Sequence, residues 1–159
     1  TRFTRLEYVQ ACIMGLDRWG PACGLTQKGK LFLLAQMAQE SGNFLYLKEI
    51  GGASKRYAPY YGRGPIQVTW LPMYRQIQTK AFPRMGIGGV NIVSDPGCLE
   101  RSLMLAVAGT MGWVMLKPRA VSAANSGDVK ALTRAVNGGL NGLATRLEYT
   151  RRIYNACAK

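Results

Sequence analysis

The sequence predicts one domain of the mainly α (α+β) class, and three observations support this prediction. Of the 159 residues, 48% are hydrophobic and 18% are charged, which suits one packed core and excludes a disordered tail or a coiled coil. Most apolar residues recur at helical spacing. Residues 43–68 break this pattern with Tyr, Gly and Pro, so they predict an irregular segment with at most a short hairpin. We expect a single domain over residues 1–159, with function carried by the irregular segment.

Helix-capping residues predict the first two helices. The sequence Thr4-Arg5-Leu6-Glu7 is a capping box, which indicates a helix that runs toward Leu16. Thr26 is placed to cap a second helix, whose apolar residues again follow helical spacing. Gly42 stands where that helix should end.

Proline and aspartate predict the next two helices. Thr69 followed by Pro72 indicates a helix that continues through Ile77. The pair Asp95-Pro96 indicates the start of a long apolar helix that ends before Pro118. Its apolar stretch is interrupted by glycine and threonine and is too short to span a bilayer, so we expect it in the core.

Glycines bound the last two predicted helices. One covers about residues 128–136 and ends at Gly138-Gly139, and the other covers residues 142–156. No basic and then apolar stretch opens the chain, so the sequence predicts no signal peptide within it.

The charge of the chain narrows its partners. Lys and Arg total 21 against 8 Asp and Glu, which gives a net charge of +13. Such a surface favours an anionic partner, namely nucleic acid, an anionic membrane face or an acidic cell-wall polymer. The basic residues are scattered in blocks no longer than two, which argues against a nucleic-acid-binding arm. A basic surface that serves solubility alone is the other interpretation.

The absence of histidine and the spacing of cysteine exclude several kinds of site. Without histidine there is no Ser-His-Asp or Cys-His arrangement and no His-containing zinc site. The four cysteines lack CxxC spacing, and we expect no metal and no organic cofactor. Two disulfides, Cys12–Cys23 and Cys98–Cys157, and four buried thiols are both compatible with the sequence.

Glu40 and Glu49 are the candidate pair for acid–base chemistry. Glu40 falls in the last turn of the second predicted helix, near Met37 and Phe44. The negative end of the helix dipole and the apolar neighbours both favour the protonated acid, which is the form that a general acid needs. Glu49 follows in the loop, within reach of the opposite side of a cleft. From spacing alone, both could equally be surface carboxylates.

The other carboxylates have structural explanations. Three stand at predicted helix starts, where a negative charge is favourable. The remaining three lie beside basic residues on predicted helices or at their ends, so we expect ordinary surface ion pairs from Asp17, Glu100 and Glu148.

Three motifs resemble the signature of family 19 glycoside hydrolases, the chitinase family that also includes compact phage and bacterial cell-wall lysins. They are Ala38-Gln39-Glu40-Ser41-Gly42-Asn43-Phe44, Tyr60-Tyr61-Gly62-Arg63-Gly64-Pro65-Ile66-Gln67-Val68-Thr69, and Ala135-Val136-Asn137-Gly138-Gly139-Leu140-Asn141-Gly142-Leu143 with Arg146 downstream. The resemblance covers about residues 30–155. The short distance between the first two motifs is similar to that of the compact lysin branch.

The resemblance implies a lysozyme-like domain of two lobes, with the irregular segment lining the cleft between them. It implies that Glu40 is the general acid, that Glu49 is the general base, and that the hydroxyl of Thr69 helps to hold the attacking water. It further implies four residues that line the cleft, contact sugar or orient the carboxylates: Tyr61, Gln67, Asn137 and Arg146.

Each of these positions also has a structural interpretation. Thr69 could be a helix N-cap and Asn137 a helix C-cap. Arg63 is expected to pair with a carboxylate or with carbonyl groups. Three aromatic residues suit either sugar stacking or core packing, namely Tyr57, Tyr60 and Trp70.

The chain departs from the family pattern at two positions, and the second of them bears on the substrate. Gln39 replaces the usual histidine before the catalytic glutamate, and Met73 replaces an asparagine that helps chitinases to grip N-acetylglucosamine. Together with the positive charge, this favours hydrolysis of the β-1,4 glycan of bacterial peptidoglycan by an inverting muramidase-type enzyme. Chitin hydrolysis is the alternative, and a non-catalytic cationic glycan-binding or membrane-disrupting protein is an alternative of another class.

The peptidoglycan reading implies partners and a place of action. The partners are peptidoglycan strands and the anionic bacterial envelope, with an immunity protein only if the chain is a secreted toxin, and no nucleic acid. The enzyme would act in the bacterial periplasm or cell wall after release or injection.

Overall fold

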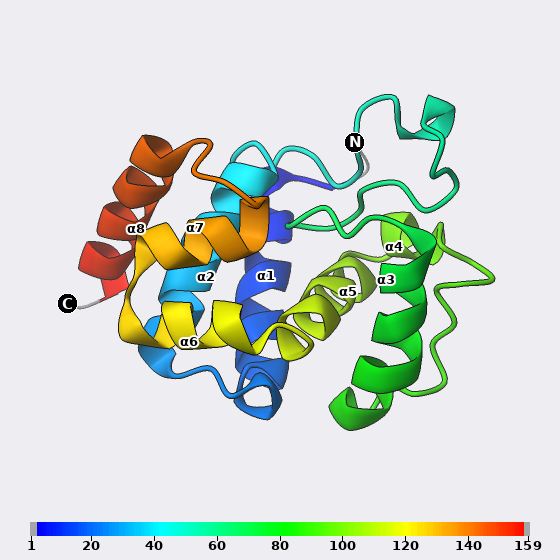
Figure 1. Cartoon of the computed structure of the whole chain (residues 1–159), viewed down its shortest axis with the longest axis horizontal. Coiled ribbons are helices and arrows are strands. Elements are labelled where there is room, and N and C mark those ends of the chain that lie inside the picture. The colour runs from blue at the N-terminus through cyan, green and yellow to red at the C-terminus, as the bar shows by residue number, and fades with distance from the viewer. Residues whose placement is uncertain (1–2, 158–159) are drawn as a thin grey trace.

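The computed structural model describes residues 3–157, and helices dominate it (Figure 1). The α-helices are α1 (Arg5–Trp19), α2 (Gln27–Glu40), α3 (Leu71–Gln76), α4 (Cys98–Arg101), α5 (Leu103–Met115), α6 (Pro118–Ser126), α7 (Val129–Asn137) and α8 (Leu143–Cys157). Short 3₁₀ turns η1 (Pro21–Cys23), η2 (Gly52–Ser54) and η4 (Phe82–Met85) and one π-helical turn η3 (Ile77–Ala81) complete the elements. This is the mainly helical, lysozyme-like class that the sequence predicted.

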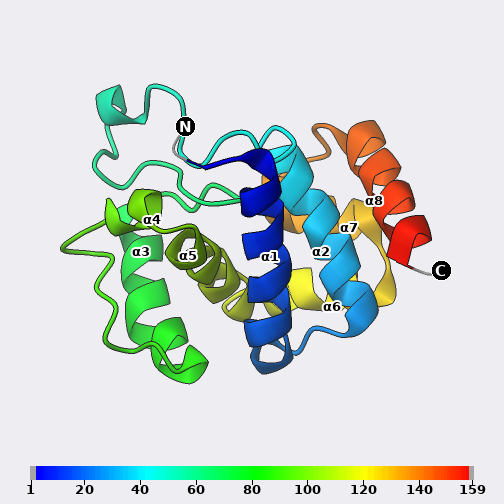
Figure 2. The same ribbon diagram turned by 180° about the vertical axis from the view of Figure 1, so that it is seen from behind.

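The helices form two groups joined through α1 and α5. Helix α2 packs against α6 and α8, and α6 packs against α7, so these four helices form one group. On the other side of α5 lie α3, α4 and η3, and α1 packs along α5 (Figures 1 and 2). The irregular segment runs along one end of the molecule above both groups, where Figure 2 shows it beside the start of α1. The two groups correspond to the two expected lobes.

The predicted caps form as expected. The Thr4 hydroxyl accepts from the Glu7 backbone N–H at 3.1 Å, and Thr26 accepts from Gly29 at 3.0 Å. Asp128 accepts from the backbone N–H of Ala131 at 2.9 Å. Each of these caps depends only on residues three apart in the sequence, which is why the sequence predicts them correctly.

Two helix boundaries differ from the prediction. Thr69 is not a helix cap, because α3 begins at Leu71 and the Thr69 hydroxyl donates instead to the Gln67 carbonyl at 2.8 Å. The long apolar helix is broken at Ser102, whose backbone is extended and whose hydroxyl caps α5 by accepting from Leu105. A serine that caps a new helix separates α4 from α5.

Helix α6 was not predicted from the sequence, which indicated only that the preceding helix ends before Pro118. Proline suits the first position of a helix, where its missing N–H is not needed, and here Pro118 begins α6 while α5 ends at Met115. Pro118 therefore both limits α5 and begins α6.

The expected hairpin is reduced to two isolated antiparallel bridges. Arg63 pairs with Lys48 on one side and with Val68 on the other, and within the described residues no longer strand forms. The irregular segment is therefore held by only a few backbone hydrogen bonds.

The cysteines form neither predicted disulfide. Cys12 is buried, Cys23 and Cys98 are half-buried, and Cys157 is exposed, all as free thiols. The alternative of four buried thiols is therefore correct for Cys12 alone. Burial raises the pKa of the Cys23 thiol to about 11, so it stays protonated near neutral pH. No described helix is both long and apolar enough to cross a membrane.

Helices α1 and α5 approach so closely that only glycine fits at residue 15. A Cβ atom at this position would lie 2.2 Å from Val107 Cγ1, in the middle of the core. Val107 is fully buried and lies on α5, so it has no room to move aside.

We expect Gly15→Ala to lower the free energy of unfolding by about 1–3 kcal/mol, because the added methyl group overpacks the contact between α1 and α5. Urea denaturation followed by circular dichroism measures this change. Gly89→Ala is the control, since a Cβ there meets no atom within 4 Å, and we expect a change within about 0.5 kcal/mol. Equal effects of the two substitutions would contradict the close contact.

Candidate active site

Three short chain segments lie side by side in the irregular segment and form what we call the ladder, residues 47–49, 61–64 and 67–69. Glu49 N–H donates to the Gly62 carbonyl at 2.8 Å, and Gly64 N–H donates to Leu47 at 2.7 Å. Arg63 and Val68 exchange two backbone hydrogen bonds, of 3.1 and 2.9 Å. The ladder thus connects the segment that carries Glu49 to the motif that ends at Thr69.

The carboxylate of Glu49 is held by two hydrogen bonds. The Tyr57 hydroxyl donates to Glu49 Oε1 at 2.6 Å, and the Gly62 backbone N–H donates to Oε2 at 3.0 Å. The hydrogen bond to the Glu49 carboxylate raises the pKa of Tyr57, so the phenol remains a donor in the neutral range. Glu49 is therefore oriented from both sides while it stays half-buried.

Gln67 lies close to Glu49 because Gly62 stands between them without a side chain, and Thr69 is joined to Gln67 by the hydrogen bond to its carbonyl. A Cβ on Gly62 would be 2.9 Å from Gln67 Oε1 and 3.3 Å from Glu49 Cβ. Gln67 and Trp70 both have positive φ, 61° and 77°, a strained conformation for residues with side chains. Strain of this kind is concentrated at functional sites, and here it flanks Thr69.

Glu40 is the last residue of α2 and forms an ion pair with Arg146 of α8. Arg146 Nη2 lies 2.6 Å from Glu40 Oε1, with side-chain exposures of 2% and 19%. Arg146 also donates to Gln36 Oε1 at 2.5 Å and to the Asn141 carbonyl at 3.0 Å. The sequence pattern indicated apolar neighbours for Glu40, and the structure adds a guanidinium from a distant helix, that of Arg146, one of the residues that the family resemblance implied.

The last two predicted contact residues, Tyr61 and Asn137, have different surroundings. Tyr61 does not point toward Glu49, since its hydroxyl donates to Glu100 Oε2 at 2.8 Å and its ring lies 3.8 Å from the Arg63 guanidinium. Asn137 is exposed at the end of α7, where the helix cap is Gly138.

The loop after α7 returns to the end of α2. A Cβ on Gly142 would lie 2.7 Å from the amide nitrogen of Gln39, the residue before Glu40. The structure therefore brings together Glu40, Arg146 and this loop as one group, and Glu49, Gln67 and Thr69 as another.

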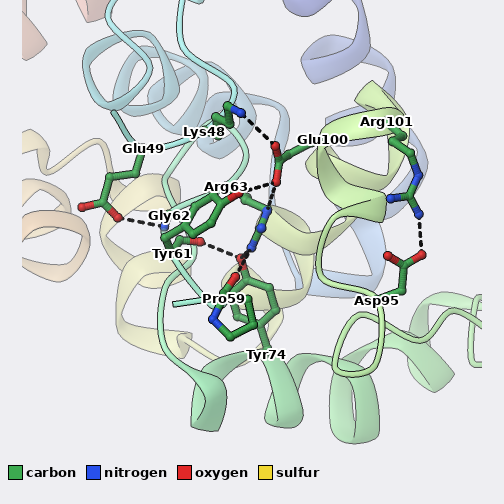
Figure 3. Close-up of polar contacts among 10 residues, drawn as sticks. All are labelled: Lys48, Glu49, Pro59, Tyr61, Gly62, Arg63, Tyr74, Asp95, Glu100 and Arg101. Atoms are coloured by element: carbon green, nitrogen blue, oxygen red, sulfur yellow. Dashed lines mark hydrogen bonds and ion pairs between the residues drawn. The ribbon is translucent and has the colours of Figure 1, made fainter. Parts of the chain in front are cut away.

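The prediction that Glu100 forms an ordinary surface ion pair is wrong. Its carboxylate does not form an ordinary surface pair, because it receives Arg63 Nε at 2.7 Å, the Tyr61 hydroxyl at 2.8 Å and Lys48 Nζ at 3.3 Å (Figure 3). Burial alone would raise the pKa of Glu100, but the hydrogen bonds and the charge of Arg63 outweigh it and lower that pKa.

Arg63 has the structural role that was expected of it. Its side chain is 3% exposed, and besides Glu100 it donates to the Pro59 carbonyl at 2.7 Å and to the Tyr74 hydroxyl at 3.0 Å. An arginine between two glycines in an apolar setting signals a buried cation that needs a carboxylate. The sequence does not say which of its eight acidic residues is that partner, and the structure shows that it is Glu100.

The other two surface pairs are confirmed. Asp17 pairs with Lys30, and Glu148 pairs with Arg151 and Arg152.

The aromatic candidates divide into one residue that packs against the core and one pair nearer the surface. Tyr60 is half-buried, meets the Tyr74 ring edge to face and donates to the Val93 carbonyl, so it packs against the core. Trp70 is 46% exposed, lies 4.7 Å from the Tyr57 ring and has the Arg56 guanidinium above it. Of the three candidates, exposed Trp70 and half-buried Tyr57 beside it are the ones available for sugar stacking.

A hollow of about 600 Å³ adjoins the ladder without joining the two carboxylates. Its lining includes Tyr46, Lys48, Glu49 and Glu100, and it does not include Glu40. Among residues 3–157, no three His, Cys, Asp or Glu side chains gather closely enough to hold a metal ion.

We expect Arg146→Met to lower the free energy of unfolding by about 2–4 kcal/mol, because it removes the cation that pairs with Glu40 and the donor that binds the buried Gln36 Oε1. The control is Arg151→Met, whose partner Glu148 is exposed, and we expect a change below about 0.5 kcal/mol. Urea denaturation at low salt measures both variants. A loss as small as that of the control would contradict the role of the buried guanidinium.

Comparisons with known proteins point to one family. No family model matches the chain. One endochitinase of Arabidopsis thaliana is 32% identical over 143 residues, which is 82% of this chain and 47% of that protein. Another from the same plant is 35% identical over 118 residues, which is 67% of this chain and 38% of that protein. The chain therefore spans less than half the length of these relatives.

Solved structures agree with the sequence relatives. Chitinase C from Streptomyces griseus superposes with a TM-score of 0.66 at 19% identity, over 92% of this chain and 82% of that one. A class IV family 19 chitinase from Zea mays gives 0.65 at 23% identity, over 96% and 80%. These structures share the fold, and the sequence relatives are chitinases by name. The chain belongs to the chitinase-like family 19 glycoside hydrolases.

Proposed function

We propose that this chain hydrolyses β-1,4 bonds in a glycan that contains N-acetylglucosamine. The observation that supports this proposal best is that Glu40 and Glu49 each have their own positioning partners. Arg146 holds Glu40, while Tyr57 and the Gly62 backbone hold Glu49. Two carboxylates are the minimum equipment for hydrolysis of a glycosidic bond, and here each of them is held in a defined orientation.

Each carboxylate has a distinct role in this mechanism. Protonated Glu40 donates its proton to the departing glycosidic oxygen, and Arg146 then stabilises the carboxylate that remains. Glu49 accepts a proton from water as the water attacks the opposite face of the sugar. The Thr69 hydroxyl already donates to Gln67, so it is left to accept a hydrogen bond from that water. This sequence of steps inverts the anomeric carbon.

Chitin is the substrate that the comparisons favour, because the relatives are named as chitinases. We therefore propose chitin as the first candidate substrate, ahead of peptidoglycan, which the sequence alone favoured. Trp70, which is exposed and packs on the Tyr57 ring beside Glu49, suits stacking on a sugar ring.

Two observations favour peptidoglycan as the second candidate. The net charge of +13 suits an anionic polymer better than neutral chitin. Met73 is half-buried against the core, so this position offers an apolar group where an amide would bind an N-acetyl sugar. If peptidoglycan is the substrate, the anionic envelope is the partner, and the enzyme acts in the periplasm or cell wall after release or injection. An immunity protein follows only if the chain is a toxin.

We expect Glu40→Gln and Glu49→Gln to keep the fold and each to lose on the order of 10²-fold or more in turnover, the usual scale for a positioned acid or base. The matched control is Glu148→Gln, which changes an exposed ion pair on α8 and should retain full activity. Reducing-end release measures turnover, and circular dichroism checks the fold. Near-normal turnover in folded Glu40→Gln would overturn the assignment of the site.

We expect the wild-type enzyme to release the α-anomer first, because direct attack by water inverts a β-linked sugar. Early NMR spectra of the products measure this, and a β-anomer that forms first would exclude direct displacement by water.

We expect the substrate class to follow from paired incubations with chitin oligomers and with purified peptidoglycan, analysed by mass spectrometry of the products. Cleavage of chitin oligomers alone would support a chitinase, and cleavage of peptidoglycan alone would support a cell-wall lysin.

If peptidoglycan is cleaved, lysis of whole walls should fall steeply as salt rises, because salt screens the positive surface over about 8–10 Å. Cleavage of short soluble glycans should change little. The sugar at the new reducing end then distinguishes a muramidase from a glucosaminidase. Binding without cleavage of either polymer would favour the non-catalytic glycan-binding alternative.

A further inference from the structure

The two faces of the ladder carry different groups. In an extended segment, successive side chains point to opposite sides, so Lys48 and Glu49 diverge from neighbouring positions. Figure 3 shows Lys48 and Arg63 directed toward Glu100, while Glu49 points away from it. Glu100 therefore lies behind the ladder, on the side opposite to the Glu49 carboxylate.

The carboxylate of Glu100 joins two of the three ladder segments. Lys48, at 3.3 Å, comes from the segment that carries Glu49. Arg63 and Tyr61, at 2.7 and 2.8 Å, come from the segment whose Gly62 N–H donates to Glu49. One side chain on α4 thus bridges the base to the backbone group that orients the base.

Few other interactions hold the ladder segments in register. Its backbone pairing amounts to two isolated bridges, and both of them involve Arg63. The Arg63 side chain is 3% exposed, and its other acceptors, the Pro59 carbonyl and the Tyr74 hydroxyl, carry no charge. Without Glu100, the buried guanidinium would lose its only carboxylate partner among the described residues, and such a cation is unstable where it stands.

We propose that Glu100 is a positioning residue for Glu49, which it fixes at a distance by clamping Lys48 and Arg63 on the back of the ladder. This inference rests on the proposed function, because it assigns Glu49 as the base. Misplacement of a reacting group by about 1 Å costs on the order of 10²-fold in rate, so a clamp of this kind acts on turnover more than on substrate binding.

Two variants test the clamp. Glu100→Ala removes all three contacts, and we expect kcat to fall about 10- to 100-fold while KM changes less than about twofold. Glu100→Gln keeps an oxygen for Arg63 and Tyr61 but loses the charge and the contact with Lys48, so we expect an intermediate loss. The control is Asp95→Asn, which breaks the neighbouring ion pair with Arg101 without reaching the ladder and should leave kcat unchanged. The substrate is whichever soluble oligomer the wild type cleaves, from chitin or from peptidoglycan.

A double-mutant cycle separates positioning from general stabilisation. If Glu100 acts through Glu49, then adding Glu100→Ala to Glu49→Gln should lower the residual rate by less than about twofold. An additive loss, or a loss confined to KM, would overturn the inference. Each variant is assayed well below its melting temperature, and if Glu100→Ala does not fold, Glu100→Gln completes the same cycle.

The same set of variants identifies which proposal fails. Near-normal turnover of Glu49→Gln alone would overturn the proposed function, and the positioning role with it. A large loss in Glu49→Gln together with an additive effect of Glu100 would overturn only the positioning role.

Discussion

The structure depends on the need to neutralise guanidinium groups that are buried in the protein. Arg63 and Arg146 are 3% and 2% exposed, and a charge at such depth is stable only with a carboxylate and further hydrogen bonds. Arg63 has Glu100, and Arg146 has Glu40. Each pair joins segments that are far apart in the sequence, so the two arginines fix how the irregular segment and the last helix meet the rest of the fold.

The two buried pairs have different relations to the candidate chemistry. Arg146 contacts Glu40 itself and anchors it to the Gln36 amide in the middle of α2. Arg63 instead pairs through its backbone with Lys48, the residue before Glu49. One guanidinium therefore acts on a reacting carboxylate directly, and the other acts through the backbone.

The irregular segment is ordered although part of its backbone is strained. It has no long strand within the described residues, and Gln67 and Trp70 adopt positive φ on either side of Thr69. Such conformations persist only where surrounding contacts impose them. Here the Gln67 amide donates to the Gly64 carbonyl, and the Trp70 N–H donates to the Tyr60 carbonyl. The helical core is rigid by comparison, because α1 and α5 touch through a glycine that leaves no space. A rigid scaffold that supports a strained loop is a common arrangement at sites of catalysis.

Local interactions were predictable from the sequence, and long-range ones were not. Thr4, Thr26 and Asp128 cap their helices because the groups they bind lie three residues away, and the helical class follows from apolar spacing over a few turns. The candidate pair Glu40 and Glu49 came from motifs, and the family is the one that the motifs resemble. Sequence could not assign Glu100 to Arg63, since 37 residues separate them and only folding brings them together.

Tertiary structure also decided between alternatives that the sequence left open. The Thr69 hydroxyl turns to Gln67 rather than to the helix, because the strained backbone at Gln67 and Trp70 delays α3. The thiols stay unpaired because the fold gives each cysteine its own surroundings, from the core at Cys12 to the surface at Cys157. In each case the deciding partner is set by packing in space, and the sequence carries that information only through the fold as a whole.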